Sequence, residues 1–169
     1  MEARDLLLEV FDRLPGLVRE AVRTLSAEQL RQPPGPGANT VGWLVWHLTR
    51  VQDSHVAEVL DAEQVWLTSD WADAFGRTAD PADTGFGHSA AEVAALAPRD
   101  ADALVGYHEA VAARTRDFLA GLTPADLDRV VDENWDPPVT LGVRLASVAD
   151  DDLQHVGQAA YARGLIERS

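Results

Sequence analysis

The sequence contains no cysteine among its 169 residues. This absence excludes disulfide bonds, iron–sulfur clusters, zinc sites built from cysteine and a cysteine nucleophile. Any thiol chemistry would therefore depend on a small thiol that the protein borrows from its surroundings.

Basic residues are scarce as well, with 14 Lys and Arg against 28 Asp and Glu and a formal net charge of −14. Such a chain repels phosphate backbones, and no basic cluster interrupts the acidity, so nucleic-acid binding is excluded. No apolar run approaches the roughly 18 residues that a membrane span needs. Because the first residues carry acids and no long apolar core, we expect a soluble cytoplasmic protein.

Four long segments carry the periodicity of amphipathic helices, with apolar residues every three or four positions. They span approximately residues 4–24, 41–60, 100–119 and 141–164. Pro15 interrupts the first segment and predicts a kink or a restart there. Ser26 and Ser89 are expected to cap short helices, and Asn39 or Thr40 the second long one.

Residues 61–88 hold Trp66 and Trp71 among Asp, Thr and Gly, and they predict a long, mostly irregular connection. No alternating strand pattern is present. The chain is therefore predicted to be one all-α domain over residues 1–169, a four-helix bundle with a long, partly irregular connection after the second helix. In the last helix the residues expected to face inward are Leu145, Val148, Leu153, Val156 and Ala160.

Three side chains from two of these helices form a candidate metal site. Asp151 and His155 are four residues apart, so a helix places them on the same face one turn apart. His47 can approach them from the second long helix. Two imidazoles and a carboxylate suit a divalent ion with positions left open for water or substrate, and Zn²⁺, Ni²⁺, Fe²⁺ and Mn²⁺ all fit that set.

Structural interpretations of the same residues remain open. The run of acids at 150–152 is also typical of a solvated acidic patch. A lone histidine on an apolar helix face, such as His47, is often a core residue bonded to a carbonyl. His55, His88 and His108 are weaker ligand candidates, although His88 could contact a substrate.

The motif "WHL" at 46–48 and the pattern D-x-x-x-H-x-G-Q at 151–158 resemble the DinB superfamily of DinB/YfiT-like metalloenzymes, and within it the actinobacterial DUF664 branch of mycothiol-dependent transferase-like proteins. The resemblance extends over essentially the whole chain and implies that His47, Asp151 and His155 are the metal ligands. The commonest form of the second motif has two histidines, so Asp151 is a departure that keeps an oxygen ligand.

The resemblance implies a divalent-metal-dependent enzyme that uses a low-molecular-weight thiol such as mycothiol for S-transfer or detoxification of an electrophilic small molecule. The absence of cysteine is consistent with this chemistry. A non-catalytic metal-binding stress-response protein and a purely structural bundle are the alternatives. The exposed helix faces also suit a homodimer. The residues expected to bind the cofactor are Trp43, Arg50, Trp66, Trp71 and Gln158, with Arg144 and Arg163 as further candidates.

Overall fold

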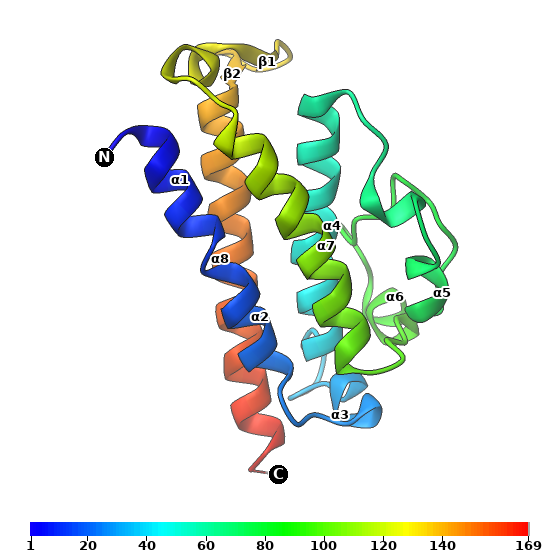
Figure 1. Ribbon diagram of the computed structural model, residues 1–169. Coiled ribbons are helices and arrows are strands. Elements are labelled where there is room, and N and C mark those ends of the chain that lie inside the picture. The colour runs from blue at the N-terminus through cyan, green and yellow to red at the C-terminus, as the bar shows by residue number, and fades with distance from the viewer. Residues whose placement is uncertain (169) are drawn as a thin grey trace.

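The computed structural model describes residues 1–168. The long elements are α1 (Ala3–Phe11) with α2 (Leu14–Val22), α4 (Val41–Leu60), α7 (Ala101–Ala120) and α8 (Leu141–Ile166), and the short ones are α3 (Ala27–Arg31), η1 (Val65–Leu67), α5 (Trp71–Ala74), α6 (Ala90–Ala95) and η2 (Pro124–Asp128). The long elements lie side by side (Figure 1). Helices α1 and α2, which together form the first rod of the bundle, run in the same direction as α8, while α4 and α7 run in the other (Figure 1). This arrangement confirms the predicted all-α bundle.

The helix boundaries follow from local chemistry. Pro15 is the second residue of α2, where its missing N–H needs no helical acceptor, so the first rod restarts at this point as predicted. Ser26 and Ser89 form capping boxes at the starts of α3 and α6. Of the two candidates before α4, Thr40 is the cap, because its side-chain oxygen accepts a hydrogen bond from the Trp43 N–H at 3.1 Å.

Helix α4 is buried on almost every side. It packs against α8, α7, α3 and α2, and every residue from Val41 to Arg50 is buried. A helix in this position must also bury its polar side chains, which then need partners inside the protein. The buried polar residues of α4 are His47, Thr49, Arg50, Gln52 and Asp53.

The inward face of α8 differs from the prediction at two positions. Leu145, Val148 and Val156 are buried as expected, but Leu153 is 41% exposed and Ala160 is also exposed, whereas Asp152 and Ala159 are buried. The prediction for Leu153 and Ala160 was wrong because Asp152 takes an inward position. Burying a carboxyl group costs free energy, so this residue was not expected to face the core. Burial raises the pKa of Asp152 well above its ordinary value, and the charge of Asp151 acts in the same direction.

Two short strands, which were not predicted, precede α8. Strand β1 (Val130–Asp132) pairs antiparallel with β2 (Val139–Thr140). They lie at the top of the bundle in Figure 1. Strands of three and two residues are too short to show an alternating pattern in the sequence.

The connection after α4 is mostly irregular, as predicted, with η1 and α5 as its short helices. It lies to one side of α4 and α7 in Figure 1. Among residues 1–168, no helix has both the length and the apolar composition to cross a membrane.

His108 on α7 generates a prediction about acid stability. Its ring is completely buried, Nδ1 shares a hydrogen bond of 3.2 Å with Thr49 Oγ1, and burial lowers its pKa from 6.5 to about 4. The folded protein therefore favours neutral imidazole, so this group makes folding less favourable as the pH falls from the unfolded pKa toward the folded one.

Between pH 8 and pH 5 we expect the free energy of unfolding to fall by about 2 kcal/mol more in the wild type than in His108→Gln, because glutamine does not titrate. Urea unfolding at several pH values measures the difference. Parallel pH profiles for the two proteins would contradict the prediction.

Candidate metal centre

Helices α4 and α8 bring His47, Asp151 and His155 together. Each residue offers one potential ligand atom, and these three atoms all lie within 4.8 Å of one another. The ring centroids of the two histidines are 4.7 Å apart. The structure thus assembles the three residues that sequence analysis selected, although about a hundred residues separate His47 from the other two.

The orientation of His47 is fixed by a backbone carbonyl. Its Nδ1 lies 2.5 Å from the oxygen of Thr84. Since a carbonyl oxygen can only accept, Nδ1 carries the proton and Nε2 keeps the lone pair that a metal requires. Burial lowers the pKa of His47, while the bond to Thr84 acts in the opposite direction. The net shift favours the neutral imidazole that binds metals.

Asp151 and His155 each hold a polar atom without a partner. Asp151 Oδ2 and His155 Nδ1 are buried and accept or donate no hydrogen bond within residues 1–168. The contact between Asp151 Oδ1 and His155 Nε2 is 3.9 Å, which is too long for a hydrogen bond. Unpartnered buried polar atoms are costly, and a divalent cation would satisfy them. The three candidate ligands and the unpartnered buried atoms on two of them therefore fit a metal ion.

Trp43 lies beside the candidate metal site. Its ring stacks on His47 with centroids 4.6 Å apart and an angle of 14° between the planes. On the same side, Gly85 has a φ of +88°, and a Cβ there would lie 3.0 Å from His47 Nδ1 and 2.8 Å from the ring of Trp46. The backbone at Gly85 therefore passes so close to these rings that there is no room for a side chain, and its positive φ also suits glycine.

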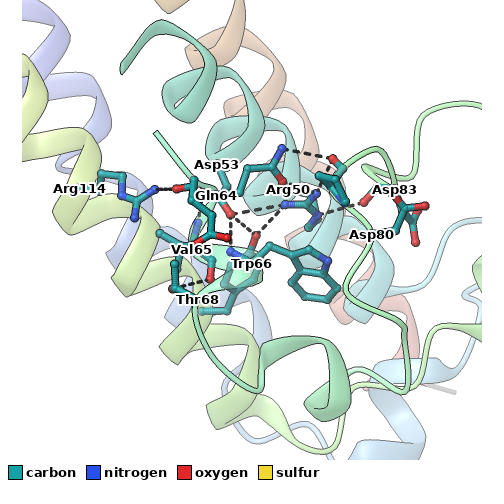
Figure 2. Close-up of polar contacts among 12 residues, drawn as sticks. Arg50, Asp53, Gln64, Val65, Trp66, Thr68, Asp80, Asp83 and Arg114 are labelled. Carbon is teal, nitrogen blue, oxygen red and sulfur yellow. Dashed lines mark hydrogen bonds and ion pairs between the residues drawn. The ribbon is translucent and has the colours of Figure 1, made fainter. Parts of the chain in front are cut away.

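Arg50 and Trp66 lie in the core, away from solvent. Both side chains are fully buried, and the Arg50 guanidinium lies 5.0 Å from the centroid of the Trp66 ring. Figure 2 shows that the guanidinium is surrounded by polar groups of the protein. Neither side chain keeps a free surface for a cofactor, so the structure does not support the binding roles predicted for them.

The other predicted cofactor residues lie in two places. Trp71 packs against α7, with its ring 5.5 Å from that of Tyr107, and these contacts do not include the metal ligands. Gln158 is exposed and lines a groove of about 310 Å³ that begins one helical turn beyond His155. Of the five residues, Trp43 and Gln158 are therefore the two beside the site.

The remaining candidate arginines and histidines are buried in the core or bonded to other groups of the protein. Arg144 donates to Glu58, Asp132 and His55, and Arg163 donates to Glu167 and the carbonyl of Glu20. His108 is a core residue. His88 lies beside the site, where it is bonded to Trp43 and Asp83.

The groups that orient His47 were not predicted from the sequence. The carbonyl of Thr84 leaves no signal in its residue type, because every residue has a carbonyl. Gly85 in the "GFG" stretch did offer a signal, since glycine marks positions where the backbone needs a positive φ or a close approach. The long irregular connection after α4 thus belongs to the site.

Comparison with known proteins identifies the family of the chain. The model of the DinB superfamily matches residues 10–159. The chain belongs to the DinB superfamily. This DinB-superfamily protein is also similar to a solved structure, the conserved protein of locus from Enterococcus faecalis, with a TM-score of 0.90 and 30% sequence identity over 100% of this chain and 99% of that chain. No protein with a curated description matches the chain.

The candidate metal centre leads to a prediction about the stability of this DinB-superfamily protein. A ligand that binds only the folded state raises the free energy of unfolding by about 2.7 kcal/mol at a hundred times its Kd. We expect Zn²⁺ to stabilise the wild type in this way and Asp151→Ala to lose most of the effect. The free energy of unfolding of untagged, chelator-treated protein, measured with and without Zn²⁺, tests this prediction.

Asp150→Ala is the matched control for this prediction. Asp150 is the preceding residue on the same helix, is exposed and accepts a hydrogen bond only from Gln154 Nε2 within the described chain. It should keep the full response to Zn²⁺. Equal responses of Asp150→Ala and Asp151→Ala would contradict the assignment of Asp151 as a ligand.

Proposed function

We propose that this protein is a divalent-metal-dependent enzyme that joins a low-molecular-weight thiol, such as mycothiol, to an electrophilic small molecule. The observation that carries the proposal is the convergence of His47, Asp151 and His155 with unpartnered buried atoms on the last two. Membership of the DinB superfamily supports the metal. The absence of cysteine supports a thiol that comes from outside the chain.

The protein's own residues would hold and shape the reaction site. Three protein ligands leave at least one coordination position open, as in catalytic metal sites generally. A divalent ion bound there supplies Lewis acidity, which lowers the pKa of a coordinated thiol. Trp43 covers one face of His47 and limits the access of water from that side.

The groove beside the site suits the electrophile. Leu44 lies one turn before His47 on α4, and Gln158 lies one turn after His155 on α8, so both helices lead from the ligands into the groove. Its lining has no charged side chain among the described residues. We infer that it holds an uncharged, largely apolar part of the substrate, with Asn39, Gln158 and the hydroxyl of Tyr161 as its hydrogen-bonding groups.

The overall reaction forms one bond and breaks another. The sulfur of the thiol forms a bond to the electrophilic carbon, and the bond from that carbon to its leaving group breaks. The leaving group departs with the electron pair, and the thiol proton passes to solvent. No oxidant or reductant is required.

This proposal predicts thiol conjugation that depends on His47. Zn²⁺-, Ni²⁺- or Mn²⁺-loaded protein is incubated with mycothiol and a panel of alkyl and aryl halides, and conjugates are measured by mass spectrometry. His47→Ala should reduce the rate by a factor of about 10² or more, because it removes a ligand. His55→Ala, two turns further along α4, should retain the rate.

Calorimetric titration of mycothiol into the metal-loaded protein tests binding separately from turnover. Stoichiometric metal with neither thiol binding nor conjugation would contradict the proposed activity and indicate a non-catalytic metal-binding protein.

A further inference from the structure

Residues 77–88 approach the predicted metal ligand His47 in two ways. The carbonyl of Thr84 accepts a hydrogen bond from Nδ1, and the backbone at Gly85 rests on the imidazole. His88, in the same segment, binds Trp43, whose ring stacks on His47. One segment therefore contacts a nitrogen of this imidazole and holds the Trp43 ring that covers one of its faces.

Arg50 anchors the segment from inside the bundle. Its Nε donates to the carbonyl of Asp83 at 3.0 Å, and its Nη2 donates to the carbonyl of Pro81 at 3.1 Å. The guanidinium is itself held by Asp53 and by the hydroxyl of Tyr107. Figure 2 shows Arg50 between Asp53 and the segment that carries Asp83. Because Asp83 precedes Thr84, this anchor fixes the carbonyl that orients His47.

His88 provides the second connection. The indole N–H of Trp43 can only donate, so His88 Nδ1 accepts at 3.2 Å. The proton of the His88 ring is then on Nε2, which donates to Asp83 Oδ1 at 3.0 Å. Arg77 Nε donates to the other oxygen of that carboxylate at 3.0 Å. In this series of hydrogen bonds, the donor or acceptor role of each group is therefore fixed by the group beside it.

We propose that residues 77–88, anchored by Arg50, are a positioning device that presents His47 Nε2 to the metal, with Arg50 and His88 as positioning residues. The inference rests on the proposed metal centre. Partners that orient a metal-binding histidine typically contribute a factor of 10–100 to metal affinity. Neither Arg50 nor His88 need contact the ion for this effect.

His88→Phe tests the device, because phenylalanine keeps a ring and loses both hydrogen bonds. We expect the Kd for Zn²⁺, measured by competition with a chromophoric chelator, to rise by about 10–100-fold. His88→Gln offers an acceptor and a donor and should recover most of the affinity. His55→Phe is the control, since His55 lies on α4 but is bonded to Arg144.

The visible spectrum of the Co²⁺-loaded protein separates positioning from stability. A displaced His47 changes the coordination geometry and hence the absorption bands, whereas a mere loss of stability lowers the melting temperature of the metal-free protein and leaves the bands in place. We expect altered bands in His88→Phe and wild-type bands in His88→Gln.

Two further variants act on the backbone of the segment. Arg50→Met removes the anchor but also empties a buried polar site, so its folding must be checked by circular dichroism. Gly85→Ala is independent of that anchor, because the added Cβ would lie 3.0 Å from His47 Nδ1 at a positive φ and must displace the segment. It should weaken Zn²⁺ binding by a similar factor of about 10–100.

The outcomes distinguish this inference from the proposed function. Wild-type affinity and spectra in both His88→Phe and Gly85→Ala would overturn the positioning role and leave the metal centre intact. Equal losses in His88→Phe and His88→Gln would overturn the hydrogen-bonding role of His88. Absence of Zn²⁺ uptake by the wild type would overturn both proposals. Weakened binding in the variants without thiol conjugation in the wild type would support the positioning role alone.

Discussion

The burial of α4 is the constraint on which the rest of the structure depends. A helix enclosed on nearly all sides cannot leave its polar side chains in water, and each needs a partner in the surrounding elements. Asp53 meets this need with the N–H groups of Val65 and Trp66, which fixes the first turn of the connection after α4. Arg50 then holds a later part of the same connection. The irregular segment is thus ordered by the polar groups of the helix that it covers.

The charge of the centre also follows from its surroundings. As metal ligands, two imidazoles and one carboxylate carry a formal charge of −1, in a protein whose formal net charge is −14. The field of the whole molecule draws divalent cations toward it and opposes anionic substrates. The uncharged groove beside the ligands agrees with this balance. The proposed thiol transfer would therefore favour neutral electrophiles over phosphates or carboxylates.

Periodicity and spacing predicted most of the fold and the three candidate ligands, because helical amphipathicity and an i, i+4 pair are local properties. What the sequence could not show depends on tertiary structure. Asp152 faces the core although its type favours the surface, and Arg50 is buried and bonded within the protein although it was expected to bind the cofactor. Thr84 acts through its backbone carbonyl, a group that every residue has, so its residue type gives no sign of this role. The short strands β1 and β2 were likewise too brief to be seen.

The ligands also have a topological consequence. His47 lies early in α4 and Asp151 lies in α8, so an ion bound by both joins two parts of the chain about a hundred residues apart. Within the folded protein this is a cross-link, but unlike a disulfide it is released when the chain unfolds, so it stabilises only through its binding to the folded state. A chain without cysteine would thereby gain a cross-link that forms and is released as the concentration of free metal changes, whereas a disulfide responds to the redox potential.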